Sequence, residues 1–211
     1  GFRVDMARSL VKNDPERKAT IETWNYLFKF IRKEYPKAYF ISEWSIIYES
    51  GLAGFDCDFA VDSVDCFKML TDNEDMKSSI NDKKIKFYMD ELNLRFDSEK
   101  KYNISIGQIS GSHDRQRIAS LLDEKRLRSY LLIMYSIPCN PWLFAGDEIG
   151  MKQNTNLNKY GGYNRTGCRT PFQWNNEKNK GFSKATESNL VLPVNKDNIS
   201  LENCLNDEKA S

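Results

Sequence analysis

Short apolar runs alternate with longer amphipathic patterns over the first 150 residues. Five runs end at or near a carboxylate, and they cover residues 1–5, 38–43, 52–58, 102–114 and 141–148. Each run predicts a buried strand, because parallel strands covered on both faces lack a clean alternation of apolar and polar positions.

Between these runs, apolar residues recur at the three- and four-residue steps of amphipathic helices. The pattern is clearest over residues 20–35, which Pro36 ends, and it recurs over residues 76–96 and 115–136. Strands that alternate with helices predict βαβ units and a parallel sheet, so we expect an α/β fold. Residues 151–211 lack such a pattern and are typical of a long functional loop or of a segment without its structural context.

The charge balance argues against nucleic acid as the main partner. The 211 residues include 31 Lys and Arg against 30 Asp and Glu, a net charge of +1, whereas nucleic-acid binding favours a basic surplus. A hydrophobic share of 40% fits a packed globular protein. No apolar run reaches the length of a membrane span, so we expect no membrane partner.

The cysteine and histidine counts argue against a metal site. Five cysteines show no C-x-x-C spacing, and the chain has a single His, so we predict no metal. Reduced thiols favour a cytoplasmic location. The chain opens at Gly1 without an initiator Met. We therefore expect its true N-terminus to lie outside this sequence, so that secretion stays open.

Acidic residues stand at the ends of predicted strands, where (β/α)8 barrels place catalytic groups. Asp5 is a candidate nucleophile, because Arg3 lies on the same strand face and favours the ionised carboxylate. Glu43 is a candidate general acid, because burial beside Trp44 would keep it protonated near neutral pH. Two such carboxyl groups are what glycoside hydrolysis requires. The structural alternative for Asp5 is a structural ion pair with Arg3, and for Glu43 it is a turn residue beside a packed Trp.

His113 and Asp114 follow the fourth run in a loop that opens at Gly111. An Asp and a neutral imidazole can together bind sugar hydroxyl groups. The pattern leaves a structural role for this His equally open.

These segments resemble the α-amylase superfamily of retaining α-glucan hydrolases and transglycosidases. Gly-Phe-Arg-Val-Asp at 1–5 resembles its strand-four motif, Ile-Ser-Glu-Trp at 41–44 its strand-five motif, and Ser-His-Asp at 112–114 its strand-seven motif. Residues 145–151 resemble the strand-eight segment. Residues 161–175, called the 161–175 loop below, resemble the Arg-Thr-Pro-Met-Gln-Trp loop of the α-glucosidase, oligosaccharidase and neopullulanase-like branches. The resemblance covers nearly the whole chain in order.

The resemblance implies a partial TIM (β/α)8 barrel. Residues 1–150 would form its second half, strands four to eight with the intervening helices. Residues 151–211 would be the long βα loop after strand eight, leading towards a last helix outside this sequence. An incomplete sheet exposes an edge and apolar faces, so we expect residues 1–211 alone to be poorly stable and inactive. Robust cleavage of maltooligosaccharides by this chain alone would contradict that expectation.

The resemblance also implies site roles. Asp5 would be the nucleophile, Glu43 the acid and base, and Asp114 the acid that stabilises the transition state. The residues that bind the substrate would be Arg3, His113 and Arg117. Trp174 and Tyr163 are candidates for stacking on sugar rings, with local packing as the alternative.

Two departures from the family pattern bear on the site. Ser112 replaces the usual Asn before His-Asp. Ser9 stands where many α-amylases have a His that helps to bind calcium. Calcium is therefore not supported by the residues here, and we expect no cofactor.

Three functions follow from the sequence. The first is hydrolysis of α-glucosidic bonds in starch-derived glucans or malto-oligosaccharides. The second is a transglucosidase or a trehalose-synthase-like isomerase, and the third is a non-catalytic glucan-binding or interaction relative. Retention of Asp5, Glu43 and Asp114 favours an enzyme. Linkage, chain length and oligomeric state are undetermined.

Overall fold

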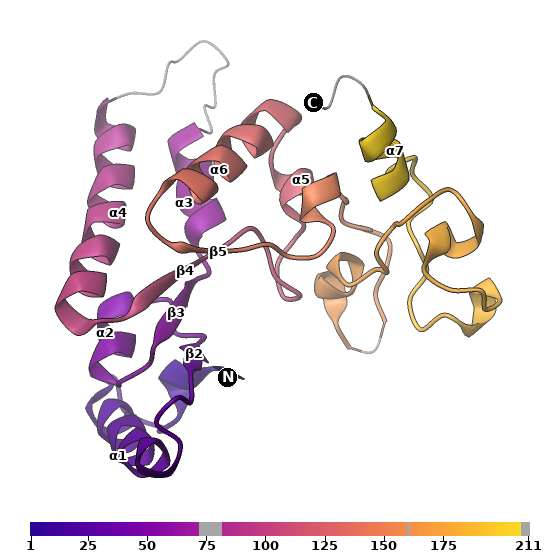
Figure 1. Ribbon diagram of the computed structural model, residues 1–211. Helices are drawn as coiled ribbons and strands as arrows, with labels where there is room; N and C mark the ends of the chain where they lie inside the picture. The colour runs from indigo at the N-terminus through magenta and orange to yellow at the C-terminus, as the bar shows by residue number, and fades with distance from the viewer. Residues whose placement is uncertain (72–81, 160, 208–211) are drawn as a thin grey trace. The chain divides into compact units, whose positions relative to one another are not determined.

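A computed structural model describes residues 1–71, 82–159 and 161–207. Five strands form one sheet in chain order (Figure 1), and each adjacent pair is parallel. The strands are β1 (Phe2–Val4), β2 (Phe40–Ser42), β3 (Cys57–Ala60), β4 (Ser105–Ile109) and β5 (Asn140–Trp142). The predicted α/β class and parallel sheet are confirmed.

Helices connect the strands, as expected for βαβ units. They are α1 (Lys18–Glu34), α2 (Ile47–Leu52), α3 (Ser63–Thr71), α4 (Asp82–Tyr102), α5 (Ile118–Leu121), α6 (Glu124–Ser136) and α7 (Leu201–Asn206). The helix predicted over 20–35 is confirmed as α1. Of the helix predicted over 76–96, residues 76–81 lie outside the described residues, and the rest belongs to α4.

Three predicted elements have wrong boundaries. The buried strand expected over 141–148 covers only Asn140–Trp142, and its residues are exposed. The third strand was expected over 52–58, but Leu52 ends α2 and the strand begins at Cys57, because Gly54 at φ 87° ends the helix in a turn. The helix expected over 115–136 is divided into α5 and α6. Leu122 is extended, and the Asp123 carboxylate caps the new helix by accepting the Arg126 N–H at 2.9 Å.

The described residues form two compact units. The first contains Gly1–Ile109 and Leu132–Trp142, and the second contains Ser110–Leu131 and Leu143–Ser211. The whole sheet belongs to the first unit. The second unit includes α5, α7 and the 161–175 loop. The predicted division at residue 150 into a barrel half and a loop stays a prediction.

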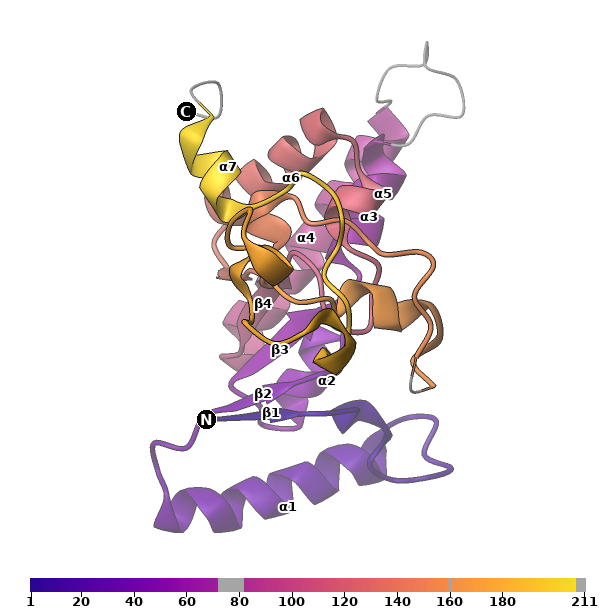
Figure 2. The ribbon, with the colours of Figure 1, turned by 90° about the vertical axis from the view of Figure 1, so that its right-hand side faces the viewer.

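Aromatic residues form the centre of the core in the first unit. Phe28 of α1 lies 4.7 Å from Phe40 of β2 and 4.8 Å from Phe55, measured between ring centroids. Trp24 and Trp44 extend the same cluster. Figure 2 shows α1 alongside β1 and β2, and the contact of Phe28 with Phe40 joins α1 to β2. Pairs of this kind contribute about 1 kcal/mol each beyond their burial.

Strand register divides the sheet into two faces. Arg3 pairs with Ile41, which pairs with Cys57, so these residues share one face. Val4, Ser42 and Asp58 share the opposite face, towards the helices. Asp5 and Glu43 follow two residues after Arg3 and Ile41, and alternation carries them onto the face of Arg3.

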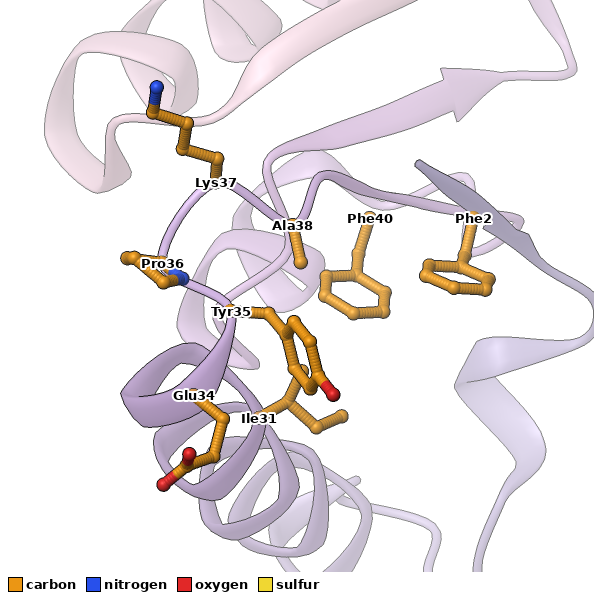
Figure 3. A pocket seen from close by; sticks show the side chains of 8 residues that line it. All are labelled: Phe2, Ile31, Glu34, Tyr35, Pro36, Lys37, Ala38 and Phe40. Carbon is orange, nitrogen blue, oxygen red and sulfur yellow. The ribbon is translucent and has the colours of Figure 1, made fainter.

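An apolar groove of about 740 Å³ lies between the C-terminal end of α1 and the rings of Phe2 in β1 and Phe40 in β2. Figure 3 shows the rings of Phe2 and Phe40 side by side near Tyr35 and Ile31. Phe2 is 63% exposed and Tyr35 is 69% exposed, so this groove keeps apolar surface in water at a cost in free energy.

Among the described residues, no helix combines the length and apolarity needed to cross a bilayer.

Candidate active site

Arg3 joins the two predicted catalytic carboxyl groups. Its Nη1 donates a hydrogen bond to Asp5 Oδ1, and its Nη2 lies 3.1 Å from Glu43 Oε2. Asp5 follows β1 directly, and its side chain is 68% exposed. The structure thus brings Arg3, Asp5 and Glu43 together at the carboxyl ends of β1 and β2. Strand alternation predicted the pairing of Arg3 with Asp5.

Glu43 is held at its backbone and at its carboxyl group. Its N–H donates to the Val4 carbonyl at 3.0 Å, which continues the pairing of β1 and β2. Its Oε2 accepts the Met6 N–H at 3.0 Å. Met6 has a φ of 45°, in the left-handed region, so the turn after β1 directs this amide at Glu43. The Glu43 side chain is 26% exposed and so partly buried, but Trp44, the neighbour expected to bury it, packs instead in the aromatic core with Phe55.

His113 and Asp114 belong to the second unit, where the 161–175 loop holds them. Asp114 Oδ1 accepts hydrogen bonds from Arg169 Nη2 at 2.7 Å and from Arg165 Nη1 at 3.2 Å. Arg169 Nε also donates to the His113 carbonyl at 2.7 Å. The predicted site residues therefore form two clusters, one in each unit.

The two arginines on Asp114 are residues that sequence reasoning missed. The 161–175 loop stood out as a motif, but the sequence assigned no role to Arg165 or Arg169. Between them, the buried Cys168 thiol lies 3.2 Å from the His113 carbonyl and 3.0 Å from the Arg165 carbonyl, and it can donate its one proton to either. Burial raises the pKa of Cys168, so this thiol stays protonated and able to donate.

Arg117 lies in a buried ion pair. Its side chain is 3% exposed, and Nη1 donates to Asp147 Oδ1 at 3.1 Å and to the Ala145 carbonyl at 2.6 Å. Burial raises the pKa of Asp147, opposed by the hydrogen bond from Ser110 and the charge of Arg117. These contacts are structural, and the substrate-binding role expected for Arg117 stays a prediction.

The described residues do not assemble a metal site. They contain no group of three or more His, Cys, Asp and Glu side chains that could hold a metal ion. Ser9, at the position of the family's calcium-linked His, donates its hydroxyl to the Met6 carbonyl at 3.1 Å.

Two aromatic side chains of the 161–175 loop, those of Tyr163 and Trp174, are exposed. Trp174 is 50% exposed and packs against Phe172 at 4.5 Å between ring centroids, and Tyr163 is 70% exposed. Packing on Phe172 agrees with the local alternative for Trp174. A role for either ring in stacking on sugar stays a prediction.

Comparison with known proteins finds similarity along the whole chain. The family model described as alpha amylase, catalytic domain, matches residues 1–211. The trehalose synthase/amylase of Mycolicibacterium smegmatis is 40% identical over 87 residues, which are 40% of this chain and 14% of that protein. A salivary alpha-glucosidase of Aedes aegypti is 31% identical over 101 residues, which are 41% of this chain and 17% of that protein.

A solved structure shows the same fold at low identity. The trehalose-6-phosphate hydrolase of Bacillus licheniformis superposes with a TM-score of 0.65 at 20% identity, over 98% of this chain and 46% of that chain. The chain thus spans less than half of this structure, and its matches span about a seventh to a sixth of the curated relatives. The predicted partial (β/α)8 barrel is confirmed.

Proposed function

Because the chain belongs to the α-amylase catalytic-domain family, we propose that its protein is a retaining glycoside hydrolase that cleaves α-glucosidic bonds in starch-derived glucans or oligosaccharides. The observation that carries this proposal is the Arg3 guanidinium between Asp5 and Glu43. This guanidinium brings the two carboxyl groups that glycoside hydrolysis uses to the same strand ends, and the retaining outcome follows from the resemblance to the α-amylase superfamily.

The proposed reaction has two steps. In the first, an Asp5 carboxylate oxygen forms a bond to the anomeric carbon while the glycosidic C–O bond breaks, and Glu43 gives its proton to the leaving oxygen. In the second, water attacks the same carbon, Glu43 takes a proton from it, and Asp5 leaves as a carboxylate. Each step conserves charge and protons, so no cofactor is needed.

Asp114 binds the sugar in this proposal. Arg165 and Arg169 hold its Oδ1, and His113 Nε2 lies 3.5 Å from its Oδ2. A carboxylate fixed by two guanidinium groups loses less rotational freedom when it accepts hydrogen bonds from sugar hydroxyls.

Product stereochemistry tests the mechanism. The full-length protein is incubated with maltotriose, and the anomer that forms first is followed by proton NMR. A retaining enzyme releases the α-anomer first, and Asp5→Asn abolishes its release. Initial β-anomer refutes the retaining mechanism, and absence of any cleavage refutes the hydrolase.

A second candidate function is transfer to a sugar hydroxyl instead of water. The similarity to a trehalose synthase/amylase supports it, because hydrolysis and transfer share the first step and differ in the acceptor. Incubation with maltose separates the two, since a hydrolase yields glucose whereas a trehalose-synthase-like isomerase yields trehalose. Binding of maltooligosaccharide without either product would instead support the non-catalytic alternative.

A further inference from the structure

Asp58 is a buried carboxyl group that the proposed reaction does not use. It lies on β3, faces the helix-covered side of the sheet and is 0% exposed. Burial raises the pKa of Asp58 to about 7, although the hydrogen bonds that its carboxyl group accepts act to lower this pKa. An apolar side chain would fill the same space without the cost of burying a carboxyl group.

Its hydrogen bonds converge on the two residues that flank Glu43. Oδ1 accepts the Ser42 hydroxyl at 2.6 Å and the Trp44 backbone N–H at 2.9 Å. Ser42 is the last residue of β2, and Trp44 lies in the following loop. One oxygen atom therefore holds the chain on both sides of Glu43, while the Glu43 carboxyl group lies on the other face of the sheet.

The backbone beyond Glu43 depends on such contacts. Ser45 has a φ of 70°, in the left-handed region that a residue with a Cβ disfavours. Conformations of this kind persist where surrounding contacts fix them. The Ser42 hydroxyl also lies 2.6 Å from the Ser50 hydroxyl of α2. The hydrogen bonds of Asp58 are therefore connected to this helix through Ser42.

We propose that Asp58 is a positioning residue that directs the Glu43 side chain through Ser42 and Trp44. This inference rests on the proposed role of Glu43 as acid and base. Displacement of a catalytic group by about 1 Å can lower a rate about 100-fold. Loss of Asp58 should therefore weaken the step in which Glu43 gives its proton to the leaving oxygen.

Leaving-group dependence distinguishes this role from general support of the fold. Cleavage of maltose expels the 4-oxygen of a glucose unit, which needs a proton, whereas the 4-nitrophenolate of 4-nitrophenyl α-glucoside leaves with little help from an acid. In the full-length protein, Asp58→Ala should lower kcat/KM about 100-fold for maltose and less than about 10-fold for the aryl glucoside. Equal losses on both substrates would overturn the proposal.

Two further variants sharpen the comparison. Asp58→Asn keeps an oxygen that can accept both hydrogen bonds, and it should restore most of the maltose activity. Ser42→Ala removes one of the two contacts and provides the same leaving-group test if Asp58→Ala does not fold. Asp62→Asn is the matched control, because Asp62 follows the same strand but pairs with Arg95 at 2.9 Å. It should leave both activities unchanged.

A spectroscopic readout separates this proposal from the proposed function. With 5-fluorotryptophan in the protein, Trp44→Phe assigns the fluorine signal of Trp44. That signal should shift or broaden in Asp58→Ala and stay in place in Asp62→Asn. An unchanged signal in Asp58→Ala overturns the positioning role even in a protein without activity, whereas a parent protein that cleaves neither glucoside refutes the hydrolase alone.

Discussion

The buried Asp58 carboxyl group predicts how stability depends on pH. Burial raises its pKa from 3.8 to about 7, so between these values the native state holds a proton that the unfolded chain has released. The stability that the neutral group provides is complete below about pH 4 and is lost as the pH rises through 7. Each pH unit in this window costs about 1.4 kcal/mol.

Asp58→Asn should remove this dependence, because an amide does not ionise. Between pH 5 and pH 8 the parent protein should lose about 3 kcal/mol more free energy of unfolding than the variant, since the native carboxyl group ionises near the middle of that interval. The Cys57 thiol next to it stays neutral, because burial raises its pKa to about 12.

Urea unfolding of the full-length protein, followed by tryptophan fluorescence at pH 5, 6, 7 and 8, measures the difference. Other titrating groups are common to both proteins, so the gap between the two curves isolates Asp58. Asp62→Asn controls for the loss of a carboxyl group at a more exposed position, where the side chain is 43% exposed. Parallel curves for the parent and Asp58→Asn would refute the reasoning.

Three other outcomes are expected. Asp5→Asn should lower kcat on maltotriose by at least about 1000-fold with little change in the urea midpoint, and unchanged turnover would remove Asp5 from the mechanism. Arg117→Met should destabilise the fold by about 3–5 kcal/mol, because it leaves the buried Asp147 carboxylate without its partner; a loss below about 1 kcal/mol in urea unfolding would contradict a buried pair. Gly167→Ala should destabilise the 161–175 loop by about 1–3 kcal/mol, because a Cβ there would collide with the Asn154 carbonyl oxygen. A melting temperature equal to that of the parent would contradict that collision.

In the first half of the chain, the local hydrophobic pattern predicted some strands and helices correctly and misplaced others. The apolar runs at 1–5 and 38–43 correspond to β1 and β2, and the helical pattern at 20–35 corresponds to α1. The run at 52–58 misplaced β3, because residues 47–52 form the short helix α2 against α4 and β3. A helix of six residues depends on such packing rather than on its own periodicity.

In the candidate site too, some contacts were predicted from the sequence and others were not. The spacing of Arg3 and Asp5 predicted a shared strand face, and the structure pairs them. Nothing in the spacing indicated that Arg165 and Arg169 would hold Asp114, because some fifty residues separate them along the chain. Arg117 stands close to Asp114 in sequence, yet its guanidinium binds Asp147 in the interior.

The sequence by itself determined the order of strands and helices and the carboxylates at the strand ends, because periodicity and strand alternation act between near neighbours. Only the tertiary structure decided which groups hold those carboxylates. The register of β1 on β2 placed Glu43 beside Arg3, and the return of the 161–175 loop brought two arginines to Asp114. Such contacts arise from packing between distant segments, which no local pattern specifies.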